Sequence, residues 1–216
     1  MNPKIKPAGI LGTIAAAGVM IALFAGCATL GEKPKPPIVP TDRGTVIYLD
    51  KYEFKRPPEG WALMRSVEGG DFELGFVKIE KGDFPTQTTF MYDDMPYGGH
   101  RDLDKRAAYY CTRFLFNSGI DLRVTKREKT QINGMDAIAI SMEGENPNRN
   151  EKAKSKVYLV KKGNRIISFV CTQWRPLNGT YSQEPFDHFE GFVQSFRFLK
   201  KDFYEAFEEE LGKAGL

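Results

Sequence analysis

The spacing of apolar residues changes near residue 102, and this change separates predicted strands from a predicted helix. Before that point apolar and polar residues alternate, which is typical of β-strands with one buried face. Prolines and glycines interrupt the alternation, so each run is expected to be a short strand. The strands predicted in the first half are 46–48, 52–54, 61–66 and 72–79.

A helix is predicted over residues 102–116. Leu103, Ala107, Cys111 and Phe114 recur at intervals of three and four residues, which places them on one helix face. Gly119 follows and is expected to end the helix in the left-handed conformation that glycine adopts readily.

Strand patterns return after this helix. Alternation and β-branched residues predict strands, and the Asn133-Gly134 pair between two of them is typical of a hairpin turn. A second hairpin is predicted around a turn at 162–164, and the polar segment 144–154 is interpreted as an exposed loop. The strands predicted here are 120–125, 129–132, 136–143, 156–161 and 165–174.

Two more helices are predicted near the carboxyl end. Ser182 is a candidate N-cap for a helix with Phe186, Phe189 and Val193 along one side. A final amphipathic helix is expected over 202–211, and we interpret it as capping the domain rather than docking a partner. Helices that lie between and after runs of strands predict an α+β fold, with a largely antiparallel sheet sandwiched by helices.

The first 26 residues have the layout of a secretory signal peptide. An apolar stretch of about 16 residues follows two lysines, and this is shorter than the roughly 20 residues that span a bilayer. The stretch ends in Phe24-Ala25-Gly26-Cys27, which resembles a bacterial lipobox, although leucine is usual where Phe24 stands. The resemblance implies cleavage before Cys27 and lipidation of that residue; an ordinary cleaved signal and an uncleaved anchor are the alternatives.

The lipobox resemblance predicts a protein attached to the bacterial cell envelope by lipid at Cys27. Ala28 follows, as in lipoproteins sent to the outer membrane, so we expect the outer membrane and a domain facing the periplasm. Residues 27–44 are rich in proline and are expected to form a semi-rigid extended linker.

Several segments of the remaining chain resemble the PsbP-like (Mog and PsbP) family. They are 52–61, 133–137, 163–165 and 189–198. The resemblance covers residues 45–199 and implies an α-β-α sandwich, with residues 200–216 forming a separate terminal helix. Known members are mostly non-enzymatic, and they include extrinsic subunits of membrane complexes, regulators that bind proteins, and envelope lipoproteins.

Composition disfavours nucleic-acid binding and catalysis. The chain carries 31 Lys plus Arg against 28 Asp plus Glu, an excess too small to suggest a nucleic-acid partner. His100 and His188 are its only histidines, and no phosphate-binding loop, dinucleotide fingerprint or nucleophile motif is present. We therefore expect neither an enzyme nor a bound cofactor.

Cysteines beyond the lipobox suggest a disulfide. Cys111 lies on the apolar helix face, and Cys171 alternates with Ile167 and Phe169, so both thiols are expected in one helix–sheet interface. The alternative is two separate buried thiols that pack as small hydrophobic groups.

A group of acidic residues and one histidine precedes the predicted helix. Carboxylates with an imidazole are ligands for Ca²⁺, Mn²⁺ or Zn²⁺, while carboxylates at a helix start also stabilise the helix. The candidate ligands are Asp93, Asp94, His100, Asp102 and Asp104.

The aromatic residues are interpreted as core, and most basic runs as solvated faces. The basic runs are 126–127, 152–156 and 161–162, and their clustering at one hairpin nevertheless favours anionic headgroups or an acidic partner. Together these patterns predict a non-catalytic envelope lipoprotein that acts as an interaction module or accessory subunit, with a protein partner. A small-ligand or metal-binding lipoprotein is the alternative.

Overall fold

The computed structural model describes residues 38–65, 74–78, 87–94, 102–163, 165–201 and 203–213. The chain divides after Pro37, and the unit Ile38–Leu216 contains all of the described residues. The predicted signal peptide, the lipobox with Cys27, and His100 therefore lie outside the described residues.

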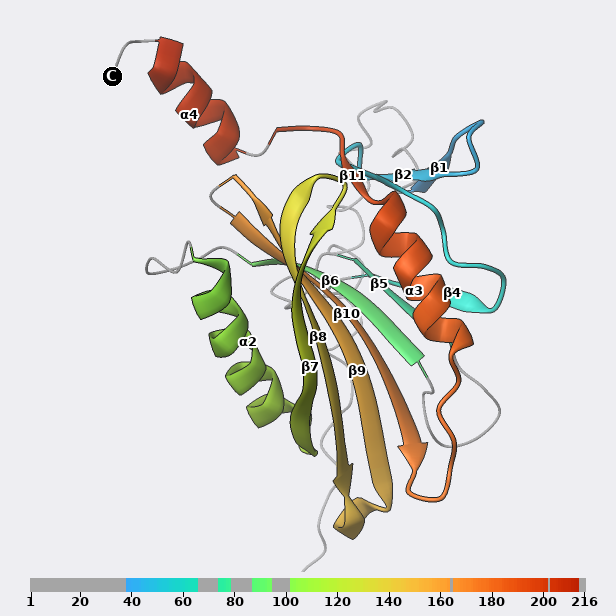
Figure 1. Cartoon of the computed structure of the whole chain (residues 1–216). Coiled ribbons are helices and arrows are strands. Elements are labelled where there is room, and N and C mark those ends of the chain that lie inside the picture. Colours follow the sequence, from blue (N-terminus) through green and yellow to red (C-terminus); the bar gives the residue numbers. More distant parts are fainter. Residues whose placement is uncertain are drawn as a thin grey trace, which may run out of the picture. The chain divides into compact units, whose positions relative to one another are not determined.

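Within these residues, the larger sheet has seven strands, and all neighbouring strands are antiparallel (Figure 1). Its spatial order is β4 (Trp61–Arg65), β5 (Leu74–Lys78), β6 (Gln87–Asp94), β10 (Arg165–Pro176), β9 (Glu151–Lys162), β8 (Met135–Asn146) and β7 (Asp121–Ile132). The sequence patterns predicted all of these strands except β6.

Strands β7 to β10 are longer than predicted. The Asn133-Gly134 turn is confirmed, with positive φ at both residues as a tight hairpin requires. The expected loop 144–154 is wrong, because β8 extends to Asn146 and β9 begins at Glu151, leaving only a short 3₁₀ turn, η1 (Pro147–Arg149), between them. Its charged residues belong to the ends of these strands near η1, where one sheet face is accessible to solvent and Lys154 lies opposite Glu143.

Strand β7 forms one edge of the larger sheet. We predicted two strands here, but β7 is continuous, with a bulge between Val124 and Lys126. The charged middle of the segment interrupts the apolar alternation without interrupting the strand, because an edge strand exposes charged side chains at little cost. Its exposed basic residues are Arg123, Lys126, Arg127 and Lys129.

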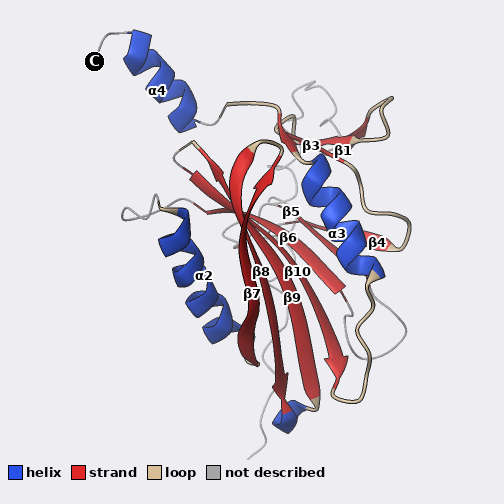
Figure 2. Ribbon diagram, viewed as in Figure 1, coloured by secondary structure: helices blue, strands red, loops and turns tan. Residues whose placement is uncertain are grey.

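A smaller antiparallel sheet, with four strands among the described residues, stands beside α3 in Figures 1 and 2. Its order is β1 (Ile38–Pro40), β2 (Val46–Tyr48), β3 (Tyr52–Phe54) and β11 (Arg197–Phe198). The expected linker through residue 44 is therefore too long, because the folded unit begins at Ile38. We predicted a linker here because of the prolines near β1. An edge strand, however, tolerates a residue without an N–H donor.

Helix α2 (Leu103–Ser118) begins one residue after the predicted start at 102 and ends two residues after the predicted end at 116. The Asp102 side chain accepts a hydrogen bond from the Lys105 backbone N–H at 2.8 Å, which caps the helix. Gly119 ends it with a φ of 67°, as expected.

Helix α3 (Glu184–Ser195) buries Phe186, Phe189 and Val193 as predicted, but Ser182 does not cap it. Gln183 holds the cap position, while the Ser182 backbone N–H donates to Gln173 Oε1 at 3.0 Å. The terminal helix, α4 (Phe203–Lys213), matches the expected 202–211 closely, but the apolar side chains of Phe203 and Phe207, on which its capping role depends, lie outside those described. None of the described helices has the length and apolar character needed to cross a bilayer.

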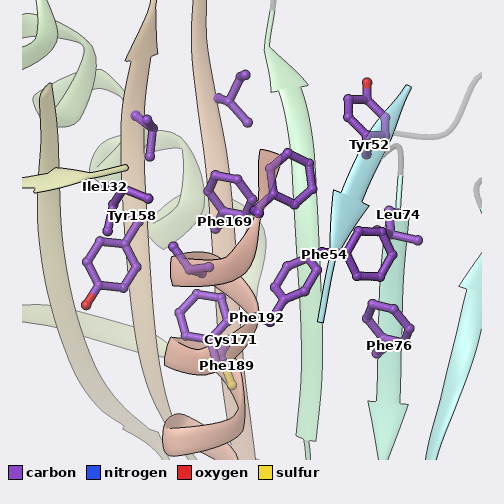
Figure 3. Packing of buried hydrophobic residues seen from close by; sticks show 14 of the residues in the cluster. Tyr52, Phe54, Leu74, Phe76, Ile132, Tyr158, Phe169, Cys171, Phe189 and Phe192 are labelled. Atoms are coloured by element: carbon purple, nitrogen blue, oxygen red, sulfur yellow. The ribbon is translucent and has the colours of Figure 1, made fainter. Parts of the chain in front are cut away.

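The core consists of apolar layers on opposite faces of the larger sheet. Ile140, Val157 and Val170 pack in one cluster with Ala107 and Cys111 of α2. Alternate residues of the same strands point the other way and pack with α3 and the smaller sheet. Figure 3 shows this second cluster, in which Phe54, Phe76, Phe169, Phe189 and Phe192 gather between strands and helix. The predicted α+β class with a largely antiparallel sheet is confirmed.

Candidate functional site

The residues predicted to bind a metal have other partners where the structure describes them. Asp104 lies 2.9 Å from Arg127 Nη2 and 2.7 Å from Lys129 Nζ, so two cations from β7 hold this carboxylate at the start of α2. Asp102 caps the same helix. Asp102 and Asp104 thus stabilise the start of the helix, which was the alternative to metal binding for these carboxylates.

The remaining predicted ligands are not brought together with them. Asp93 and Asp94 lie in β6, paired with Ile167 and Ile166 of β10, and their side chains are outside those described. No group of three metal-ligating side chains occurs in the described ranges. The metal site stays a prediction, without support from Asp102 or Asp104.

Cys111 and Cys171 are both buried, but in different clusters. Cys111 belongs to α2 and packs against one face of the larger sheet. Cys171 lies on the opposite face, among the aromatic residues under α3 (Figure 3). No disulfide joins the two among the described residues. The expected common interface is wrong, because it rested on alternation, which does not reveal which sheet face a helix covers.

His188 occupies a structural position. Trp61 Nε1 donates a hydrogen bond to His188 Nδ1 at 3.3 Å, and His188 Nε2 lies 3.9 Å from the Glu184 carboxylate one turn earlier on α3. Lys78 of β5 approaches the same carboxylate at 3.5 Å. These contacts connect the first turns of α3 to β4 and β5.

The aromatic residues form core, as expected. Phe54, Phe169, Phe192 and Phe196 are at most 2% exposed, and their ring centroids are 5.0 to 6.0 Å apart. Rings at these distances are in contact. They pack against one another between α3 and the sheet.

Most lysines of the predicted basic runs have acidic or aromatic neighbours. Lys154 lies 2.7 Å from Glu143, and Lys156 forms an ion pair with Glu190 of α3. Lys152 and Lys154 stand over the ring of Tyr181, at 5.3 and 5.8 Å from its centre. These contacts fit the solvated, charge-balanced face that we expected for most of the basic residues.

The lysines at the β9–β10 hairpin face a different environment. Lys162 and the segment Phe198–Lys201 line an open hollow of about 360 Å³, which we call the lysine hollow. Lys162 Nζ stands 4.4 Å from the centre of the Phe198 ring, in a cation–π contact. Lys200 and Lys201 are exposed, and Lys201 forms an ion pair with Glu209 of α4.

Backbone hydrogen bonds fix the position of the lysine hollow. Phe198 pairs with Tyr52 across β11 and β3, and the Leu199 N–H donates to the Lys51 carbonyl at 2.8 Å. The Phe198 ring also packs edge-on against Phe196, with centroids 5.2 Å apart. The basic runs predicted from the sequence include the 161–162 lysines but not Lys200 and Lys201, which lie almost 40 residues further along the chain.

The lysine hollow can attract negative charge while offering apolar contact. Leu199, which also lines the hollow, is 43% exposed. The chemistry of these residues suits electrostatic binding to an anionic group or surface.

Comparisons with known proteins concern the fold. No protein-family model matches this chain, and no curated protein sequence matches it. The solved structure of the Ran-binding protein Mog1p from Saccharomyces cerevisiae is similar with a TM-score of 0.51 and 11% identity, over 69% of this chain and 90% of that one. This similarity supports an α+β fold of the Mog1 kind.

Two other solved structures resemble this chain less closely. Cyanobacterial PsbP from Synechocystis sp. PCC 6803 has a TM-score of 0.45 and 12% identity, over 78% of this chain and 98% of that one. LpqN, described as involved in cell envelope biogenesis of Mycobacterium tuberculosis, has a TM-score of 0.47 and 11% identity, over 76% and 87%.

Proposed function

We propose that this protein is a non-catalytic lipoprotein of the bacterial cell envelope, in which a PsbP-like α-β-α sandwich serves as an interaction module or accessory subunit. The observation that carries the proposal is the packing of buried aromatic rings under α3 in the described domain. Because the described side chains under α3 pack against one another, we infer that partners bind at the surface of the domain. Mog1p, which shares the fold, is itself named as a Ran-binding protein.

The membrane attachment rests on Cys27 at the end of the predicted signal peptide. A lipidated cysteine with two or more acyl chains tethers a folded domain stably without a protein span. Metabolic labelling with palmitate in a bacterial host should label the full chain and leave Cys27→Ser unlabelled. An unlabelled wild-type chain, or label retained in Cys27→Ser, would show that the anchor is wrong.

The outer membrane and a periplasm-facing orientation are the proposed location, because alanine follows Cys27. Separation of inner and outer membranes on a density gradient tests the location. Ala28→Asp provides a sensitive comparison, since that change is expected to move the protein toward the inner-membrane fraction. A wild-type protein found in the inner membrane would contradict this part of the proposal.

The protein partner is tested by crosslinking in living cells, followed by capture of a tagged full-length chain and mass spectrometry. A secreted chain with Cys27 removed is the matched control, because it keeps the domain but not the proposed membrane position. A stoichiometric envelope partner, captured with the anchored form and reduced with the secreted form, is the expected result. Capture of no partner by either form would contradict an accessory-subunit role.

A further inference from the structure

The loop between β10 and α3 contains an asparagine followed by glycine, a pair that can undergo a spontaneous reaction. The backbone nitrogen after an asparagine can attack the side-chain amide. Glycine in the second position hinders this attack least, because it has no side chain. The chain contains two such pairs, Asn133-Gly134 and Asn178-Gly179, and they stand in different structural settings.

Asn133 is held both by its backbone and by its side chain. It lies in the two-residue turn of the β7–β8 hairpin, which is closed by the pairing of Ile132 with Met135. Its side-chain Nδ2 donates a hydrogen bond to the Phe196 carbonyl at 2.7 Å. Before the Gly134 nitrogen could reach the Asn133 side chain, the hairpin turn would have to rearrange and the side-chain hydrogen bond would have to break.

Asn178 is exposed and is held more weakly. In the part of the chain that the structure describes, its side chain makes no hydrogen bond or ion pair. Its backbone belongs to a turn in which the Gly179 N–H donates to the Pro176 carbonyl at 2.8 Å. Attack by the Gly179 nitrogen therefore requires the opening of one hydrogen bond in a surface turn.

Buried side chains hold the rest of this loop in place. Arg175 Nε donates to the Thr180 carbonyl at 3.0 Å, and Gln173 both donates to the Ser182 carbonyl and accepts from the Ser182 N–H. Gln173 is fully buried and Arg175 is 8% exposed. Because the backbone is anchored from Thr180 onward, the turn at 176–179 can open without a change in α3.

We propose that Asn178 is a site of spontaneous modification, which converts to aspartate and isoaspartate while Asn133 stays intact in the folded protein. The Gly179 nitrogen loses its proton to hydroxide or water and forms a bond to Cγ of Asn178. The Cγ–Nδ2 bond breaks, ammonia leaves, and a five-membered succinimide ring remains.

Water completes the reaction by opening the succinimide ring. Cleavage between Cγ and the ring nitrogen gives aspartate, whereas cleavage between the backbone carbonyl carbon and the ring nitrogen gives isoaspartate. Water is the only co-reactant, and no atom is oxidised or reduced. This inference depends neither on the lipid anchor nor on the protein partner of the proposed function.

Both products change the surface of the loop. Each replaces a neutral amide by a carboxylate and so adds one negative charge at an exposed position. Isoaspartate also lengthens the main chain by one carbon. The turn is tight, because a Cβ added at Gly179 would lie 3.1 Å from the Pro176 carbonyl oxygen. We therefore expect the isoaspartyl form to lose the hydrogen bond between Gly179 and Pro176, while Thr180 and Ser182 keep their partners.

Peptide mapping of the purified full-length chain tests the proposal, with Asn133 as the control within the same molecule. The folded chain is kept at mildly alkaline pH for several weeks and then digested at acidic pH, where the reaction is slow. Mass spectrometry detects each modified peptide by a gain of one mass unit. We expect Asn178 to react about tenfold faster than Asn133, because fewer hydrogen bonds have to open.

Three further measurements separate the fold from the chemistry. In guanidinium, where neither turn exists, the two pairs should react at similar rates. Asn178→Gln should abolish the mass change at this position, because a longer side chain closes a six-membered ring much more slowly. Asn178→Asp, which carries the charge of the product, should keep the circular dichroism spectrum and melting temperature of the wild type.

Several outcomes would overturn the inference. They are an unmodified Asn178 in the folded chain, equal rates at the two asparagines in the folded chain, and faster reaction at Asn133. Products that contain aspartate but no isoaspartate would show direct hydrolysis of the side chain instead of attack by Gly179. Chromatographic separation of the aspartyl and isoaspartyl peptides decides this last point.

Discussion

Cys111 and Cys171 lie on opposite faces of the larger sheet, with the sheet itself between them. Cys171 is fully buried, and Cys111 is 9% exposed. Burial also raises the pKa of the Cys111 thiol, which lowers its reactive thiolate fraction at neutral pH.

We therefore predict two thiols that react slowly with thiol reagents, rather than a disulfide. In a chain that begins after Cys27, Ellman titration should detect almost no reaction while the protein is folded. After unfolding in denaturant without reductant it should detect both thiols. Thiols that appear only after reductant is added would show that a disulfide exists despite this arrangement.

Asp104 connects α2 to β7, and its contribution should depend on pH. The hydrogen bond from Lys129 lowers the pKa of Asp104, and the charges of Lys129 and Arg127 lower it further. Because the pKa in the folded state lies below the ordinary value of 3.8, the stabilisation is present above that pH and is lost as pH falls through the lowered pKa.

Asp104→Asn should accordingly reduce the melting temperature at neutral pH, with a smaller difference from wild type at about pH 3. Thermal melts at both pH values measure this difference. Asp136→Asn, which removes an exposed carboxylate from β8, is the control and should leave the melting temperature nearly unchanged at both. A difference for Asp104→Asn that stays constant between the two pH values would argue against an electrostatic role.

Phe196 should be among the most sensitive core positions. Its side chain is 1% exposed and contacts the rings of Phe169 and Phe198 at 5.0 and 5.2 Å. Phe196→Ala should reduce the free energy of unfolding by about 3–5 kcal/mol, since the cavity would not collapse among rigid rings. Leu199→Ala, at an exposed position three residues later, should change it by less than about 0.5 kcal/mol. Urea denaturation compares the two, and similar losses would contradict the assigned core.

Two glycines offer a contrast between the sheet and a helix. A Cβ added to Gly144 in β8 would lie 2.1 Å from the Asp121 carbonyl oxygen, so β7 and β8 would have to separate locally. A Cβ at Gly191 in α3 meets no atom within 4 Å. We predict that Gly144→Ala is destabilising, whereas Gly191→Ala raises stability by about 0.5–1 kcal/mol through helix propensity. Urea midpoints of the two variants that move in the same direction would contradict this contrast.

Patterns local in sequence predicted the elements well. The spacing of Leu103, Ala107 and Cys111 identified α2, and Asp102 and Gly119 marked its ends. The Asn133-Gly134 turn identified a hairpin because its backbone conformation is available to few residue pairs. Such signals act within a few residues, so tertiary contacts rarely override them.

Features that depend on distant pairing escaped prediction. Strand β1 forms because β2 supplies an edge, and the charged residues after Gly144 form a strand because β9 lies opposite. The sheet face of Cys171 and the meeting of Lys162 with Lys200 are set by the order of strands and by β11. A single sequence contains no direct signal for these relationships.

The charged side chains on edge strand β7 affect how neighbouring copies of the protein can pair. Proteins tethered to a membrane diffuse in two dimensions and meet side by side more often than free molecules at the same cellular abundance. A sheet edge invites a second copy to add its own edge strand. In such a pair, the four basic side chains of one copy would come close to those of the other, and each set is opposed by three carboxylates, Asp121, Glu128 and Asp104 of α2. The remaining positive charge on β7 opposes edge-to-edge pairing of two copies, which the proposed anchor would hold on one surface.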